Sequence, residues 1–217
     1  MRVVDVEIVG RTPLLMHWDN LEWADEMDAW KNKAANKAAS KAGDDRTPAW
    51  RWIGSLYTDG AHAVMPSDNV MRALMEAGAM VPTGKGKGTF KAKTQSGIQP
   101  MSPSFAIHVN GKPVPYGPIA ALRDEPSFAG HKAKVKEMGF ELSVKRATIG
   151  QSKHVRVRPM FSDWATRISL AIIDDQIDND ALGQILECAG RFKGLGDWRP
   201  GSPKRPGPYG QFEATIR

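Results

Sequence analysis

Two stretches of the sequence combine a strand pattern with a helix pattern in the same order, and this order restricts the fold more than any other feature. In the first stretch, apolar and acidic residues alternate over 4–8 (Val-Asp-Val-Glu-Ile), which is typical of a half-buried strand. A helix is then predicted from the run Pro-Ser-Asp-Asn at 66–69, with Ser67 or Asp68 as its cap and an end near Met80.

The second stretch lies near the C-terminus. Apolar residues alternate again over 167–173, and Asp178 or Asn179 is expected to cap an amphipathic helix. A final strand is predicted at 212–216, where every second residue is apolar. Two such units predict an α+β fold, namely a ferredoxin-like or RNA-recognition-type antiparallel sheet with two helices.

Insertions are expected between these elements. Residues 19–47 are predicted to form a helical insertion, because Trp23, Met27 and Trp30 recur at the spacing of one helix face and acidic residues precede lysines along it. That apolar face either packs onto the domain or contacts a neighbouring subunit. Residues 83–160 are expected to hold loop and hairpin insertions.

A protruding basic hairpin is predicted inside the second insertion. Two alternating runs flank Gly-Gln-Ser at 150–152, as expected for a β-hairpin. In its second arm, three side chains that can carry positive charge share one face: His154, Arg156 and Arg158. Such a face either protects a sheet edge or contacts nucleic acid.

The distribution of charge points to an anionic partner. The chain carries a net charge of +6, with a pI near 9.5, and it has no Asp or Glu between residues 77 and 123. A basic loop at 83–93 lies in this segment, but it follows a helix and lacks the spacing of a phosphate-binding P-loop. We interpret it as a flexible loop that orders on a polyanion, with a merely solvated loop as the alternative. Its candidate contacts are Lys85, Lys87, Phe90, Lys91 and Lys93.

A glycine-rich run precedes the final strand. Residues 194–200 read Gly-Leu-Gly-Asp-Trp-Arg-Pro, and glycines at such a junction let the backbone come close to a ligand. The run is therefore a candidate cradle for a phosphate backbone. The alternative is a helix C-cap at Gly194 followed by an exposed loop. The candidate binding residues here are Gly194, Gly196, Trp198, Arg199, Lys204 and Arg205.

Three of these features together resemble a known family. The first strand, the run VMPSDNVMRAL at 64–74 and the late Gly-Leu-Gly…Gly-Gln-Phe strand are similar to the RAMP superfamily, in particular the backbone subunits that coat guide RNA in CRISPR effector complexes. The resemblance implies a single RAMP-like domain over 1–217, an RNA-recognition-like core, a protruding hairpin and side-by-side assembly along one strand. The sequence departs from the family at 201–208, where the glycine loop is longer, and at 198–200. GLGDWRP followed by Tyr-Gly-x-Phe-Glu also resembles small phage proteins.

Catalysis has little support in the sequence. The five histidines are scattered without the spacing of metal ligands, and we expect no cofactor and no metal. Some RAMP proteins cleave RNA with a histidine or a loop aspartate, which makes His17 and Asp19 the candidates for an endoribonuclease. A packed or hydrogen-bonded histidine is the alternative. A phage assembly or scaffold protein is a third hypothesis, and it predicts oligomers without nucleic acid.

The sequence also bears on the cellular compartment. No apolar run approaches the roughly 20 residues of a membrane span, and the chain starts directly with a strand pattern. Cys188 is the single cysteine, which excludes an internal disulfide and favours a buried thiol within a helix. We therefore expect a cytoplasmic protein of a bacterium or of a phage-infected bacterial cell.

The prediction from the sequence is a protein that coats single-stranded RNA or DNA as a homo-oligomer or with other subunits. Aromatic stacking and phosphate contacts suffice for such binding without a sequence motif. Phe90 and Trp198 are the expected stacking platforms. The expected backbone contacts are Lys85, Lys87, Lys91, Lys93, Arg156, Arg158, Arg199, Lys204 and Arg205.

Overall fold

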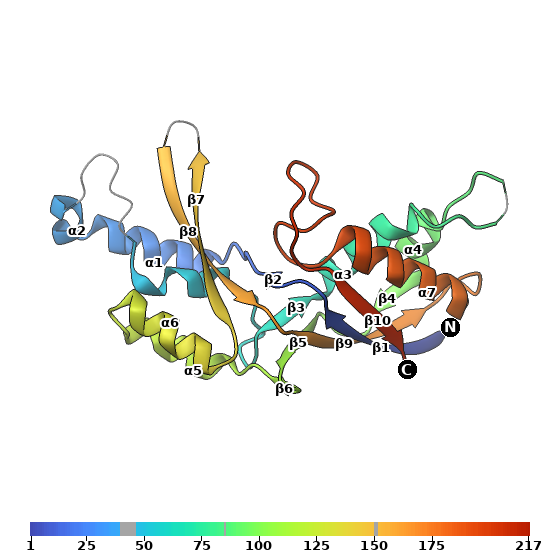
Figure 1. Cartoon of the computed structure of the whole chain (residues 1–217), viewed down its shortest axis with the longest axis horizontal. Helices are drawn as coiled ribbons and strands as arrows, with labels where there is room; N and C mark the ends of the chain where they lie inside the picture. Colours follow the sequence, from blue (N-terminus) through green and yellow to red (C-terminus); the bar gives the residue numbers. More distant parts are fainter. Residues whose placement is uncertain (40–46, 85, 150–151) are drawn as a thin grey trace.

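The fold is α+β, with mostly antiparallel strands and several helices, as the sequence predicts. The structure is a computed structural model that describes residues 1–39, 47–84, 86–149 and 152–217. Every strand pairing in these ranges is antiparallel. Figure 1 shows two parts side by side, one around the main sheet and one around a long hairpin.

The main sheet is built around the first strand, β1 (Arg2–Gly10). Its neighbours are β9 (Ala165–Ile172) on one side and β10 (Phe212–Ile216) on the other. Val6 lies opposite Ile168 of β9 and Ile216 of β10, so the alternating apolar residues of three strands share one face. The remaining strands of this sheet are β3 (Val64–Pro66), β4 (Ile98–Pro100), β5 (Ser104–Val109) and β6 (Lys112–Pro113).

The range expected to hold only insertions contributes to this sheet. Both β4 and β5 pair with β9, and β3 and β6 pair with β5. Residues 83–160 therefore supply strands of the main sheet as well as loops and the hairpin. Prolines interrupt these short apolar runs in the sequence, so local periodicity does not identify them.

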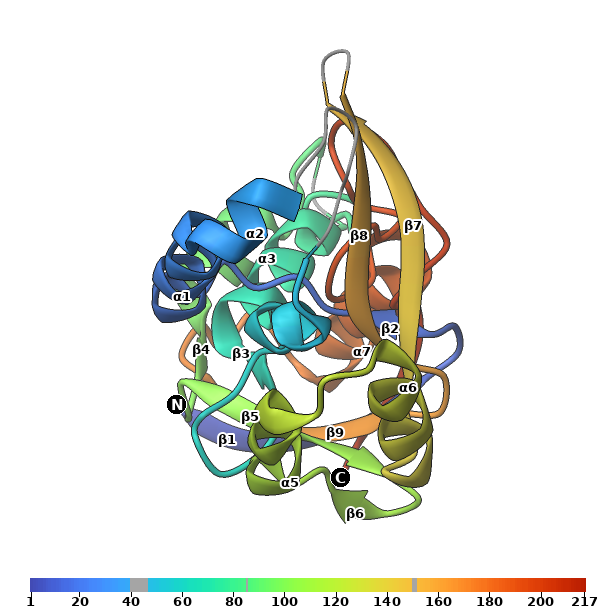
Figure 2. The same ribbon diagram turned by 90° about the vertical axis from the view of Figure 1, so that its left-hand side faces the viewer.

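Three helices lie on one face of the main sheet in both views (Figures 1 and 2). They are α3 (Ser67–Gly78), α4 (Lys91–Gly97) and α7 (Asn179–Cys188). The predicted cap of α7 is confirmed, since the Asp178 side chain accepts a hydrogen bond from the Ala181 N–H at 2.8 Å. The predicted side-chain cap of α3 is wrong, because Pro66 occupies the cap position and Ser67 is already helical.

The second sheet carries the predicted hairpin. It consists of β2 (Leu14–Leu15), β7 (Glu141–Ile149) and β8 (Ser152–Phe161), in the order β2-β8-β7. Figures 1 and 2 show β7 and β8 extending well beyond the body of the molecule. The side chain of His154 lies outside the residues whose side chains are described.

The helical insertion packs onto the domain. It contains α1 (Leu21–Asn32) and α2 (Ala34–Ala39), and the rest of the predicted range up to residue 46 lies outside the described residues. Met27 is buried, and the ring of Trp23 lies 5.4 Å from that of Trp50. This apolar face is therefore used within the chain, which is one of the two alternatives that the sequence left open.

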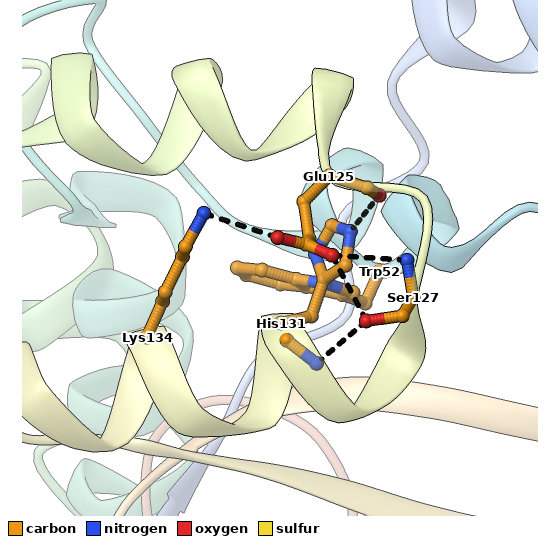
Figure 3. A network of polar contacts seen from close by, with 6 residues as sticks. Trp52, Glu125, Ser127, His131 and Lys134 are labelled. Atoms are coloured by element: carbon orange, nitrogen blue, oxygen red, sulfur yellow. Dashed lines mark hydrogen bonds and ion pairs between the residues drawn. The ribbon is translucent and has the colours of Figure 1, made fainter.

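Short helices and a buried polar network complete this part of the molecule. The helices are η1 (Ala49–Ser55), α5 (Tyr116–Ala120), η2 (Ala121–Asp124) and α6 (Phe128–Glu137). The Trp52 indole donates to His131 Nδ1 at 3.0 Å, and His131 Nε2 lies 2.9 Å from the Glu125 carbonyl (Figure 3). Both ring nitrogens are thus partnered, which satisfies a histidine buried in an apolar core. Among the helices that the structure describes, none is long and apolar enough to span a membrane.

Candidate nucleic-acid interface

Three segments project from the same side of the molecule. They are the β7–β8 hairpin, the C-terminal loop (residues 194–211) and the loop between α3 and α4, and they point the same way in both views (Figures 1 and 2). These are the segments in which the sequence places nearly all of its candidate binding residues. The tertiary structure therefore brings the three predicted regions onto one side.

The C-terminal loop begins with the helix cap that was the alternative interpretation of Gly194. Helix α7 continues into a π-helical turn, η3 (Ala189–Lys193), and Gly194 follows with a φ of +69°. Its N–H donates to the Ala189 carbonyl at 2.8 Å. A left-handed conformation at this position favours glycine, so Gly194 ends the helix.

The glycines of this loop bring it close to the protein's own backbone. Gly196 has a φ of +75°, and a Cβ there would lie 2.5 Å from the Leu15 carbonyl oxygen. The adjacent Asp197 N–H donates to the same carbonyl at 2.7 Å, and the Gly210 N–H donates to the Pro13 carbonyl at 2.9 Å. The close approach expected toward a ligand is thus an approach to β2 and the residue before it.

Two arginines expected to contact phosphate form internal ion pairs instead. Arg158, on β8, is 6% exposed and pairs with Asp197 of the C-terminal loop. Arg199 is also 6% exposed and binds Glu76 of α3 through both guanidinium nitrogens, at 2.9 and 3.0 Å. These guanidinium groups fasten the loop to the hairpin and to α3, so the sequence assignment of both residues to backbone contacts is corrected.

The predicted binding residues of the basic loop differ in their exposure and in their partners. Phe90 is 8% exposed and packs in the core, so it presents no ring face to a ligand and its assignment as a stacking platform is corrected. Lys93 lies 3.7 Å from Asp174. Lys87 and Lys91 are exposed, and Lys85 lies outside the described residues.

The basic face of the hairpin points toward the C-terminal loop. Lys145 lies directly opposite Arg156 in the β7–β8 register, and Ser143 lies opposite Arg158. Side chains of directly paired residues share a face, so Lys145 joins the two predicted arginines. Lys145 is not among the residues predicted from the sequence, although the pairing of the two predicted arms around 150–152 places it on this face.

The centre of the candidate interface is an aromatic pair with a cation over it. The Trp198 and Tyr209 rings lie 5.7 Å apart with 36° between their planes, and both side chains are half-buried. The Lys145 ammonium lies 4.0 Å from the Trp198 ring centroid and 5.5 Å from that of Tyr209. This is the geometry of a cation–π contact, and it joins the hairpin to the loop.

Trp198 has an unusual backbone conformation, and exposed cations follow it in the loop. Its φ is +50°, which costs a residue other than glycine about 1–2 kcal/mol. Lys204 and Arg205 are exposed, and within the described ranges no carboxylate lies at ion-pair distance from either. Strained residues cluster at functional sites, which makes this loop, with its two exposed cations, a candidate binding surface.

The candidate nuclease residues lie next to this junction. His17 Nε2 is 3.8 Å from the Asp19 carboxylate. Burial lowers the pKa of His17, although the charges of Asp197 and Asp19 oppose that effect. Among the residues that the structure describes, no group of His, Cys, Asp and Glu could hold a metal ion.

Comparison with known proteins adds no family to these observations. A scan against protein-family models finds no match, and a search of curated proteins finds none either.

Proposed function

We propose that this protein binds single-stranded nucleic acid along the side formed by the hairpin, the C-terminal loop and the loop between α3 and α4. The observation that carries the proposal is the Trp198–Tyr209 pair under Lys145, with Lys204 and Arg205 exposed in the same loop. Stacking surfaces next to cations are what a single strand requires, because bases stack on rings while phosphates contact positive charge.

The strand order supports the ferredoxin-like interpretation behind this proposal. Strands β10, β1, β9 and β4 are neighbours in that order, and each pair is antiparallel. In the chain, α3 lies between β1 and β4, where the helical insertion, β3 and α4 also lie, and α7 lies between β9 and β10. Two β-α-β units interleaved in this way are the plan of ferredoxin-like and RNA-recognition domains.

A salt titration of oligonucleotide affinity tests the proposed function. We expect Lys204→Ala/Arg205→Ala to reduce the slope of log affinity against log salt by about 1.4, since each phosphate contact on a single strand contributes about 0.7. Single strands should bind more tightly than a duplex of the same sequence. Wild-type binding that is absent, or indifferent to salt, would contradict the proposal and favour a scaffold protein.

A control variant removes the same number of positive charges as Lys204→Ala/Arg205→Ala, by the same number of substitutions, at another place on the molecule. Lys112 and Lys136 are exposed residues of β6 and α6, which lie on the side of the molecule opposite to the projecting ends of the three segments (Figure 1). We expect Lys112→Ala/Lys136→Ala to leave the salt slope as in the wild type. An equal loss of slope in both double variants would show that binding depends on net charge alone.

Coating of a strand by several copies is part of the proposal, and it rests on the family resemblance. The apolar face of α1 packs inside the chain through Met27 and Trp23, so the proposal does not depend on that face for the contact between copies. Light scattering with oligonucleotides of increasing length tests the assembly. We expect particles that grow in proportion to strand length, whereas a one-to-one complex at every length would exclude coating.

A further inference from the structure

A pocket beside the candidate interface combines aromatic rings with hydrogen-bonding groups. Its volume is about 370 Å³, and it is lined by the segment after β2, the loop before β3, the first turn of α3 and the turn before β5. The residues that matter for its chemistry are Trp18, Tyr57, Thr58, Asp68, Asn69 and Ser104. Volumes of about 300 Å³ and above are those of small-molecule sites.

The aromatic wall of this pocket is a stacked pair. The Trp18 and Tyr57 rings lie 6.1 Å apart with 29° between their planes. The Tyr57 hydroxyl donates to the His17 carbonyl at 3.1 Å, which holds the pair in place. Both side chains are only half-buried, so the pair can accept a further planar ring.

The polar groups of the pocket select the chemistry of the ligand. Asp68 is the charged residue of the lining, and the described residues that line the pocket include no Lys or Arg. A carboxylate without a cation repels phosphate, but it accepts hydrogen bonds from an amino group. Asn69 adds an amide with both a donor and an acceptor.

The position of the pocket connects it to the interface. The chain just before Trp18 lies against both parts of the interface, since the Met16 N–H donates to the Pro159 carbonyl of β8 at 3.1 Å and the Leu15 carbonyl accepts from the Asp197 N–H of the C-terminal loop at 2.7 Å. The pocket is therefore next to the junction of the hairpin and the C-terminal loop. A strand that stacks on Trp198 would pass close to it.

From this geometry we infer that the pocket takes one unstacked nucleobase with an exocyclic amino group, stacked on Trp18 and hydrogen-bonded by Asp68 and Asn69. The inference rests on the proposed function, because the base belongs to the single strand bound along the interface. Adenine, cytosine and guanine carry such a group, whereas thymine and uracil do not. Proteins that recognise single-stranded RNA sequences commonly bind an unstacked base by stacking on an aromatic side chain and by hydrogen bonds to the edge of the base.

The test compares fluorescein-labelled oligo(dA), oligo(dC) and oligo(dT) of equal length by fluorescence anisotropy. We expect oligo(dA) and oligo(dC) to bind the wild type more tightly than oligo(dT). Trp18→Ala should weaken oligo(dA) binding by roughly tenfold or more, as the loss of one stacked base requires. Trp30→Ala, at another half-buried tryptophan away from the pocket, should leave affinity unchanged.

A second variant keeps the inference open to refutation if Trp18→Ala does not fold. Asp68 is exposed, so Asp68→Ala should not disturb the core, and it removes both acceptor oxygens from the pocket. We expect the preference for oligo(dA) over oligo(dT) to fall by roughly tenfold in this variant. Equal wild-type affinity for all three oligonucleotides, or unchanged preference in folded Asp68→Ala, would overturn the inference. Those outcomes leave the proposed function standing, provided that the Lys204→Ala/Arg205→Ala variant still loses its salt slope.

Discussion

Arg199 and Glu76 form a bidentate ion pair that holds the C-terminal loop against helix α3. The guanidinium donates to the two carboxylate oxygens at 2.9 and 3.0 Å, and it also donates to the Lys193 carbonyl at 3.0 Å. Burial alone would raise the pKa of Glu76, but hydrogen bonds and charge from Arg199 and Arg72 hold that pKa below its ordinary value. One buried side chain thus connects residues that are 123 positions apart in the sequence.

Removal of this arginine is expected to destabilise the fold. Arg199→Met leaves the partly buried Glu76 carboxylate without its main partner, which should cost about 3 kcal/mol in the free energy of unfolding measured in urea. Arg72→Met removes the exposed partner of the same carboxylate and should cost less than about 1 kcal/mol. Similar losses in both variants would show that the ion pair does not fasten the loop.

Substitutions at two glycines with the same φ separate the cost of backbone strain from the cost of a steric clash. Gly196 and Gly111 both have a φ of +75°, but a Cβ at Gly111 would meet no atom within 4 Å. Gly111→Ala should therefore cost only about 1–2 kcal/mol for the left-handed conformation. Gly196→Ala should cost about 1–3 kcal/mol more, because its Cβ would press on the Leu15 carbonyl. Equal melting temperatures for the two variants would show that the C-terminal loop shifts to accommodate a Cβ at position 196 at little cost.

The stability of the helix α6 region is expected to depend on acid pH through Glu125. Hydrogen bonds from the Ser127 N–H and hydroxyl, with Lys134 nearby, lower the pKa of Glu125 from its ordinary 4.5 to about 2 (Figure 3). Because the folded state favours the ionised form, this contribution is complete above about pH 4.5 and is lost as the pH falls toward about 2.

Urea midpoints measured between about pH 5 and about pH 2 check this dependence. Glu125→Gln should flatten the curve over that interval, since the amide does not titrate. Lys134→Met should flatten it only in part, because the Ser127 hydrogen bonds remain. A Glu125→Gln curve that parallels the wild type would refute the assignment.

Trp198 is expected to affect binding more than stability. Trp198→Ala removes an aromatic pair worth about 0.5–1.5 kcal/mol to the fold, and a stacking surface worth about 1–3 kcal/mol per base. Melting temperature and oligonucleotide affinity measured on the same preparation separate the two effects, and Trp198→Phe should restore much of the affinity. A loss of stability with unchanged affinity would make the ring structural.

Local patterns in the sequence were sufficient for the framework. The alternating runs at 4–8, 167–173 and 212–216 fall on β1, β9 and β10, helical spacing predicts α3 and α7, and alternation on both sides of 150–152 predicts the hairpin. Of the two predicted side-chain caps, that of α7 is confirmed and that of α3 is wrong. Each of these signals lies within one element, because the pattern of apolar residues reflects which face of that element is buried.

The roles of individual charged and aromatic side chains depended on partners far away in the chain. Arg158 and Asp197 are 39 positions apart, and nothing near either residue indicates the other. Phe90 follows a run of glycines and lysines, yet the packing of α4 against α3 draws it into the core. Lys145, Trp198 and Tyr209 meet only because the hairpin stands beside the C-terminal loop.

The sequence by itself therefore determined the α+β class, the main elements and the segments that carry positive charge. Only the tertiary structure decided that Arg158 and Arg199 form internal ion pairs and that Phe90 is buried whereas Trp198 is half-buried. It also decided which residues line the pocket at Trp18. The physical reason is the range of the forces: backbone hydrogen bonding and amphipathic burial act within an element, whereas a site requires side chains from several elements within a few ångströms.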